Sequence, residues 1–491
     1  MKPVSLTELA AATGGRLAAA DDGRRVGPEV QLDSRRITPG ALFVAFAGEH
    51  VDGHDYIAAA AEAGAAAYLC QRVPDGLTEQ QRAGCVLVDD PADALGRLAR
   101  HLVDGLPGLT VVGITGSQGK TSTKDLLAQL LAAEAATVAP QGSFNNEIGV
   151  PLTATQVDGS TRFLVSEMGA RGVGHIRYLC GLTPPSVGVV LNVGQAHVGE
   201  FGSREAIAQA KGELVESLPP EGWAVLNGTD HRVAAMARRT RARIALFSVG
   251  ARAVEPADLL VWAEAPEADD LDRYSFTLVV ERPEQPGAPE RHPVRLRLVG
   301  RHQVANAAAA AAAALVCGLT GDQVAHALSA AETRSRWRME VTERSDQVVV
   351  VNDAYNANPD SMMAAIESLA AVVRRRRQRP GFEGAEGWAV LGDMFELGET
   401  ADDEHRAVGR AVGQLRLAHL VAVGDHAEVM SEGARVAGCP DAVVAVETEE
   451  AIKRVQPRAG DVVLVKASRA MGLERVAEAL LAADSTTGEC A

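Results

Sequence analysis

The fold of this chain is decided by residues 109–122, which read LTVVGITGSQGKTS. The first six form an apolar run typical of a buried strand, and a helical pattern runs from Lys124 to Leu131. Between strand and helix lies the pattern Gly-x-x-Gly-x-x-Gly-Lys-Thr. Strict Walker A spacing would place the first glycine at Ile114, so the motif is a variant. The segment predicts a phosphate-binding loop in an α/β domain, and an incidental glycine-rich turn is the competing interpretation.

Each residue type in this loop suits the binding of a nucleoside triphosphate. Glycines let backbone N–H groups surround the phosphates, and the helix start adds the positive end of its dipole. Lys120 is expected to reach the terminal phosphates and Thr121 to ligate Mg²⁺. The residues predicted to contact the nucleotide here are Gly113, Thr115, Gly116, Ser117, Gln118, Gly119, Lys120, Thr121 and Ser122.

Length and charge describe a globular protein that does not bind nucleic acid. A chain of 491 residues suits two to four domains, and 47% hydrophobic with 23% charged residues is the balance of a folded protein. A net charge of -16 opposes binding to phosphate backbones. The only basic run, Arg374 to Arg377, precedes Pro380 and Gly381, which favours a solvated helix end.

Cysteine usage and hydropathy predict the compartment. The six cysteines are scattered without a Cys-x-x-Cys pair, as expected for reduced thiols. The N-terminal segment is polar, and no apolar run reaches membrane-spanning length. We expect a cytoplasmic protein that does not insert into a membrane.

Strand-like and helical segments divide the chain into three α/β parts. A Leu-Pro-Gly breaker at residues 106–108 ends a small first domain, placed at residues 1–107. Apolar runs that alternate with helical segments predict a mostly parallel, helix-covered sheet in residues 108–332. The same alternation predicts a Rossmann-like domain in residues 333–491. No Gly-x-Gly-x-x-Gly follows its first strand, which favours closure over a nucleotide bound elsewhere. Residues 281–291 are rich in Pro and Glu and predict a surface loop.

Two polar residues follow predicted strands of the central part. Glu167 comes at the end of one strand and His197 shortly after the next. Because ligands bind at the carboxyl ends of strands in open α/β sheets, we predict that both serve a Mg²⁺ site beside the phosphate loop. A structural histidine is the competing interpretation for His197. Lys211, from the residues alone, is an exposed helix lysine.

The phosphate loop and a downstream segment, residues 145–151 (NNEIGVP), carry a family resemblance. They resemble the Mur ligases and their folylpolyglutamate synthetase relatives, and the likeness covers nearly the whole chain. It implies that ATP phosphorylates a carboxylate and that an amine attacks the acyl phosphate. It also implies that Lys211 is carbamylated and helps to hold Mg²⁺, and that Asn145 and Asn146 contact a muramoyl nucleotide. Catalysis is then expected from Lys120, Glu167, His197 and Lys211.

Further segments match the family's nucleotide and substrate contacts. Residues 300–306 (GRHQVAN) resemble its adenine-binding segment, although Asn306 also suits a simple helix cap. The ATP contacts that the resemblance implies in this half of the chain are His302, Asn306, Arg338, Asp353, Tyr355 and Asn356. The substrate contacts that it implies are Ser34, Arg35, Asn145, Asn146, Asn358, Ser468 and Arg469.

Three motifs are similar to those of the family members that add D-alanyl-D-alanine. They are residues 353–362 (DAYNANPDSM), residues 391–398 (LGDMFELG) and residues 466–469 (KASR), the last with Ala467 where these members have glycine. The Asp-Asn-Pro-Arg box of diaminopimelate-adding members is absent. The resemblance therefore implies a monomeric, three-domain enzyme. Its substrates would be ATP, UDP-N-acetylmuramoyl-tripeptide and D-alanyl-D-alanine, and peptidoglycan precursor would be the product. Folylpolyglutamate synthesis and ATP hydrolysis without an amide product are the alternatives.

Overall fold

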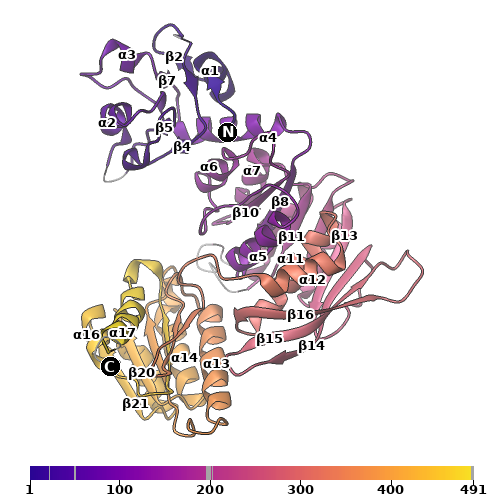
Figure 1. Ribbon diagram of the computed structural model, residues 1–491, viewed down its shortest axis with the longest axis vertical. Coiled ribbons are helices and arrows are strands. Elements are labelled where there is room, and N and C mark those ends of the chain that lie inside the picture. Colours follow the sequence, from indigo (N-terminus) through magenta and orange to yellow (C-terminus); the bar gives the residue numbers. More distant parts are fainter. Residues whose placement is uncertain (22, 49–50, 195–200, 202, 488–491) are drawn as a thin grey trace.

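The computed structural model describes residues 1–21, 23–48, 51–194, 201 and 203–487. Three α/β parts follow one another along the longest axis, as Figure 1 shows, with the N-terminal part at one end and the C-terminal part at the other. The predicted three-part organisation with mostly parallel sheets is confirmed. No helix within these ranges combines the length and the apolarity needed to cross a bilayer.

The N-terminal part is a small five-stranded sheet with helices around it. Strand order is β2-β7-β6-β5-β4, with parallel pairing except between β2 and β7, and β1 and β3 form a separate antiparallel pair. The strands are β1 (Val4–Ser5), β2 (Arg16–Leu17), β3 (Arg25–Val26), β4 (Val30–Gln31), β5 (Leu42–Val44), β6 (Ala67–Cys70) and β7 (Cys85–Leu87). The helices are α1 (Leu6–Thr13), η1 (Ser34–Arg36), η2 (Gly53–Tyr56), α2 (Ile57–Glu62), α3 (Glu79–Arg82) and α4 (Pro91–Asp104).

The central part is a nine-stranded sheet in the order β16-β15-β14-β13-β12-β11-β8-β10-β9. Its strands are β8 (Thr110–Thr115), β9 (Thr137–Val138), β10 (Phe163–Glu167), β11 (Val187–Val190), β12 (Trp223–Asn227), β13 (Arg243–Val249), β14 (Leu259–Ala268), β15 (Arg273–Glu281) and β16 (Glu290–Val299). Its helices are α5 (Lys120–Ala132), α6 (Gly149–Ala154), α7 (His175–Leu182), α9 (Arg204–Glu216), α10 (His231–Ala234), η3 (Ala235–Arg239), α11 (His302–Val316) and α12 (Gly321–Ala330). Strands β8 to β14 are parallel, whereas β15 and β16 are antiparallel additions.

Helix α11 crosses the core of this part. Residues 307–314 are all alanine, and each is fully buried against the sheet and α5. Small side chains allow the helix backbone to approach its neighbours closely, so a weakly apolar run makes a core helix. The surface loop predicted at 281–291 is found at residues 282–289, where it connects the two strands of a hairpin. Strand β15 extends to Glu281 and β16 begins at Glu290.

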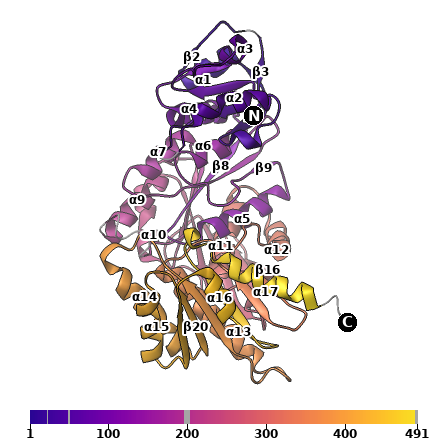
Figure 2. The ribbon, with the colours of Figure 1, turned by 90° about the vertical axis from the view of Figure 1, so that its left-hand side faces the viewer.

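The C-terminal part is a six-stranded sheet in the order β17-β18-β22-β19-β20-β21, parallel except for β17. Its strands are β17 (Glu340–Glu343), β18 (Val349–Asn352), β19 (Gly387–Gly392), β20 (His419–Val423), β21 (Asp441–Ala445) and β22 (Val462–Lys466). Its helices are α13 (Pro359–Arg376), η4 (Gly398–Thr400), α14 (Ala401–Gln414), α15 (Ala427–Val436), α16 (Thr448–Arg454), η5 (Arg469–Met471) and α17 (Glu474–Thr487). Figure 2 shows α13, α14 and α15 together around β20.

The basic run at the end of α13 was predicted to be a solvated helix end, and the structure corrects this prediction at Arg375 and Arg376. Arg376 is 1% exposed, donates to Glu343 Oε1 at 2.9 Å and stacks on Phe382, so it is not a solvated residue. Arg375 donates to the buried Asp272 at 2.7 Å, across the junction with the central part. The reason is tertiary, because the tip between β14 and β15 brings Asp272 against α13, where Ser368 also donates to it at 2.7 Å.

Candidate active site

The phosphate loop connects the end of β8 to the start of α5. Gly119 has φ 77° at the helix start, and a Cβ there would approach Asn306 Oδ1 to 2.4 Å, so glycine is required. Asn192 accepts from the Gln118 amide at 2.9 Å, and Ser117 Oγ accepts from the Gly194 amide at 2.9 Å. The loop is therefore held in place by the segment that follows β11.

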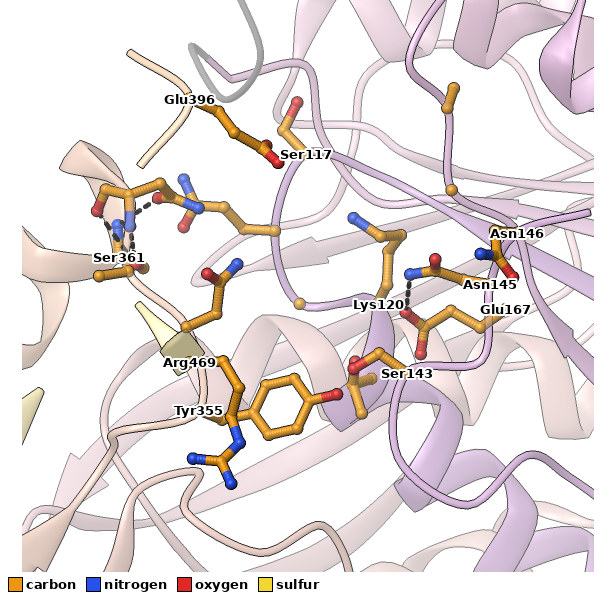
Figure 3. A pocket seen from close by; sticks show the side chains of 18 of the residues that line it. Ser117, Lys120, Ser143, Asn145, Asn146, Glu167, Tyr355, Ser361, Glu396 and Arg469 are labelled. Atoms are coloured by element: carbon orange, nitrogen blue, oxygen red, sulfur yellow. Dashed lines mark hydrogen bonds between the residues drawn. The ribbon is translucent and has the colours of Figure 1, made fainter. Parts of the chain in front are cut away.

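A cavity of about 870 Å³ lies beside this loop and is lined by all three parts of the chain. Figure 3 shows Lys120 near Asn145 and Glu167, with Tyr355 and Arg469 on the opposite side. The predicted residues that line it are Ser117, Gln118, Gly119, Lys120, Thr121, Ser122, Asn145, Asn146, Glu167, Lys211, His302, Arg338, Asp353, Tyr355, Asn356, Asn358, Ser468 and Arg469. The fold thus gathers residues from opposite ends of the chain around one space.

The central wall of the cavity consists of residues 117–122, Asn145, Glu167 and Lys211, and its charges are poorly satisfied. Glu167 is 1% exposed; its Oε1 accepts from Asn145 at 2.8 Å, while its buried Oε2 has no hydrogen-bond partner among the residues that the structure describes. Lys120 Nζ donates to the Gly116 carbonyl at 2.7 Å. An unpartnered buried carboxylate oxygen beside a phosphate loop suits a cation.

Two lysines of this wall are desolvated. Burial lowers the pKa of Lys120, an effect that the Glu167 carboxylate opposes. Burial lowers the pKa of Lys211 much further, and the nearby Lys120 charge adds to this. The prediction from the residues alone, an exposed helix lysine, is therefore wrong, because α9 turns this side chain into the cavity, where only 4% of the residue is exposed. A neutral amine is a better nucleophile than an ammonium group.

The C-terminal wall consists of residues 353–358, 393–397 and 466–469, and its charges are paired. Asp353 accepts from Lys466 Nζ at 2.6 Å and from the Met339 amide at 3.0 Å. Lys466, 3% exposed, also donates to the Asn356 carbonyl at 2.8 Å. The charged groups of this wall are thus paired with one another and with the backbone.

Two arginines and a histidine also line the cavity. Arg338 lies over the Tyr355 ring at 4.3 Å and donates to Ser143 Oγ at 3.0 Å, which joins the two parts of the chain. Arg469 lies over Trp337 at 4.2 Å. Burial lowers the pKa of His302, at the start of α11, which favours the neutral imidazole.

Several predicted residues lie elsewhere. Gly113, Thr115, Gly116 and Asn306 do not line the cavity; Gly113 packs beneath the loop against Leu214 and Met168, and Asn306 donates to Gln303. Ser34 and Arg35 lie in η1, outside the cavity, where Arg35 pairs with Asp33. His197 lies outside the described residues. The roles given to these residues stay predictions.

The cavity is also lined by residues to which the sequence analysis gave no individual role, among them Ser143, Gln303, Phe395, Glu396, Leu397 and Lys466. Lys466 is the last residue of the buried strand β22, and a charged residue at the end of such a strand could have been predicted to line a ligand site. Gln303 lies within the segment matched to adenine binding. Ser143 had no signal, because its position depends on how the loop before α6 folds back.

Comparison with known proteins agrees with this architecture. Family models match in three places: "Mur ligase family, catalytic domain" over residues 29–102, "Mur ligase middle domain" over residues 114–314 and "Mur ligase, glutamate ligase domain" over residues 337–469. A UDP-N-acetylmuramoyl-tripeptide--D-alanyl-D-alanine ligase of Mycobacterium tuberculosis is 44% identical over 99% of both chains. This chain belongs to the Mur ligase family.

Solved structures of Mur ligases share the three-part fold. A crystal structure of MurF from Acinetobacter baumannii superposes with a TM-score of 0.82 at 29% identity, covering 98% of this chain and 99% of that one. MurF ligase from Thermotoga maritima, solved in complex with ADP, gives a TM-score of 0.74 at 30% identity over 94% and 98% of the two chains. The likeness therefore extends over all three sheets of this Mur ligase.

Proposed function

We propose that this Mur ligase joins D-alanyl-D-alanine to UDP-N-acetylmuramoyl-tripeptide, forming UDP-N-acetylmuramoyl-pentapeptide, ADP and phosphate for peptidoglycan synthesis. The observation that carries the proposal is the unpartnered Glu167 oxygen beside a phosphate loop, facing a preorganised C-terminal wall. The end-to-end likeness to relatives with this activity supports the choice of substrates.

The chemistry follows from the central wall. The tripeptide carboxylate attacks the γ-phosphorus of ATP and ADP leaves; the dipeptide amine then attacks the acyl carbon, loses a proton, and phosphate leaves. Lys120 neutralises charge on the transferring group. Thr121, Glu167, His197 and Lys211 as a carbamate are the proposed holders of Mg²⁺, and the unpartnered Glu167 oxygen fits such a role. Mg²⁺ bound there would neutralise further phosphate charge.

We assign one task to each part of the chain. Residues 1–107 bind the uridine nucleotide through Ser34 and Arg35, with Asn145 and Asn146 contacting the muramoyl end. Residues 108–332 bind ATP through the loop residues already named, with His302 and Asn306. Residues 333–491 close over the nucleotide and deliver the dipeptide. Their proposed ATP contacts are Arg338, Asp353, Tyr355 and Asn356, and their proposed dipeptide contacts are Asn358, Ser468 and Arg469.

Phosphate release tests the proposal directly. Purified protein with Mg-ATP and UDP-N-acetylmuramoyl-tripeptide should release phosphate only when D-alanyl-D-alanine is added, and mass spectrometry should detect the pentapeptide. Substrate-independent hydrolysis would support an ATPase module instead, and turnover with folate and glutamate would support folylpolyglutamate synthesis. We further propose a cytoplasmic monomer, which light scattering and cell fractionation check.

A further inference from the structure

A buried histidine stands behind the C-terminal wall. His405 begins the second turn of α14 and is completely buried. Its Nδ1 lies 2.6 Å from the Ala401 carbonyl and its Nε2 lies 2.9 Å from the Met394 amide nitrogen. A carbonyl only accepts and an amide N–H only donates. The imidazole must therefore be neutral, with its proton on Nδ1 and a lone pair on Nε2.

The environment of His405 favours this neutral form. Burial lowers its pKa. The His426 ring stacks on it at 4.4 Å between centroids, and Asp402 accepts from His426 at 2.8 Å. Asp393 Oδ1 lies 3.8 Å from Nε2, beyond hydrogen-bonding distance. The Asp393 and Asp402 carboxylates raise the pKa of His405, but burial is the largest cause, and the nearby His426 charge lowers the pKa further.

Met394 belongs to the cavity loop, residues 393–397, and His405 is one of three anchors on it. Asp393 accepts from the amides of Asp425 and His426 at 2.8 and 3.1 Å. The amide of Phe395 donates to Ser468 Oγ at 3.1 Å. The Asp393 carbonyl also accepts from the Ser468 amide at 3.1 Å. The first three loop residues are thus held by residues 425–426, by α14 and by Ser468.

The fixed loop presents an apolar side chain to the cavity. Phe395 is 46% exposed and lines the cavity together with Leu397, Asn358 and Arg469. An exposed aromatic ring suits the methyl side chains of a small dipeptide, and a guanidinium suits its terminal carboxylate. Both groups lie on the C-terminal wall, opposite the phosphate loop.

We infer that His405 is a positioning residue for the dipeptide subsite: its Nε2 accepts the Met394 N–H and so sets the position of Phe395 at the cavity surface. This inference rests on the proposed function, because it requires a dipeptide to bind at this wall. His405 touches no substrate and acts only through the cavity loop.

Steady-state kinetics of three variants test the inference. His405→Leu fills similar space without an acceptor, and we expect the KM for D-alanyl-D-alanine to rise about tenfold, equivalent to about 1.4 kcal/mol. The KM for ATP should stay within about twofold. His405→Gln places an amide oxygen near the Nε2 position and should restore most of the loss. Phe395→Ala alters an exposed side chain, so it should fold and should also raise only the KM for the dipeptide.

A matched control separates positioning from general destabilisation. His419→Leu removes a partly buried histidine from β20 of the same part of the chain, where it stacks on Trp388 outside the cavity, so it should lower the melting temperature without changing the KM for the dipeptide. Equal increases in all three substrate KM values in His405→Leu, or an unchanged dipeptide KM in Phe395→Ala, would overturn the inference. Absence of dipeptide-dependent turnover in the unaltered protein would instead overturn the proposed function.

Discussion

The central wall and the C-terminal wall face each other across one cavity, yet their charged groups are satisfied in different ways. In the central wall, Glu167 Oε2 has no hydrogen-bond partner within the described part of the chain, and burial lowers the pKa of two lysines. In the C-terminal wall, Asp353 is paired with Lys466, and Asp393 accepts two backbone amides.

This difference separates two kinds of task. A catalytic group that has no partner in the free enzyme can form its interaction with charge that develops during the reaction. Such an interaction stabilises the transition state more than the bound substrate, and so it increases the rate. Groups that recognise a substrate are most useful when they are already fixed, because little ordering is then needed on binding. The central wall therefore suits phosphoryl chemistry, and the C-terminal wall suits recognition.

Breaking the ion pair of the C-terminal wall should have the largest effect. Lys466→Met leaves Asp353 mostly buried and without its charged partner, and we expect a loss of about 3–5 kcal/mol in the free energy of unfolding, measured by calorimetry. The double variant Lys466→Met/Asp353→Asn removes the remaining charge and should recover much of this loss. A loss below about 1 kcal/mol in the single variant would mean that this wall does not depend on its pairing.

Removing the unpartnered charge of the central wall should affect turnover and spare stability. Glu167→Gln keeps the shape of the side chain, and we expect kcat to fall roughly 10²- to 10³-fold, or about 3–4 kcal/mol. The melting temperature should not fall, since one carboxylate oxygen has no partner to lose. Glu428→Gln, an exposed carboxylate remote from the cavity, is the control. An unchanged kcat in Glu167→Gln would contradict a catalytic role for this wall.

Desolvation of Lys211 predicts a pH dependence of stability. Because burial lowers its pKa, the unfolded chain binds more protons than the folded chain between that lowered pKa and the ordinary value of about 10.4. The free energy of unfolding should therefore rise with pH across this window. Lys211→Met should flatten the rise and add about 1–3 kcal/mol at neutral pH in buffer free of carbon dioxide.

Adding bicarbonate tests whether Lys211 is carbamylated. Carbamylation would convert the buried amine of Lys211 into an anion, so bicarbonate should stabilise the unaltered protein and leave Lys211→Met unchanged. Urea unfolding at several pH values measures both effects. Parallel pH curves for the two proteins would contradict the desolvation argument.

The smallest effect on stability is expected at Arg35, which lies outside both walls. Arg35 is 87% exposed along its side chain, so Arg35→Ala should change stability by less than about 0.5 kcal/mol. If it clamps the uridine diphosphate, the KM for the UDP-linked substrate should rise about tenfold, or about 1.4 kcal/mol, while the KM for ATP stays the same. Arg16→Ala, another exposed arginine of the N-terminal part, is the control. An equal change in both variants would indicate a general charge effect.

The sequence alone determined those features that depend on neighbouring residues. Strand, glycines, lysine and helix follow one another within residues 109–122, so the phosphate loop could be predicted from a short segment. Glu167 was predictable for the same reason, because a polar residue at the end of a buried strand lies at the ligand-binding edge of the sheet. The three-part α/β organisation followed from the alternation of apolar runs with helical segments.

Only the tertiary structure decided features that require segments distant in the sequence to meet. Burial of Lys211 depends on how α9 packs beside the phosphate loop, and burial of Arg376 depends on Phe382 and Glu343. The role inferred for His405 depends on Met394 reaching its ring from another element. Periodicity and local spacing report which face of an element is apolar, but they do not report which partner a polar side chain meets. That choice is made by long-range packing, and here it determines which charges are paired and which remain unpartnered for a substrate.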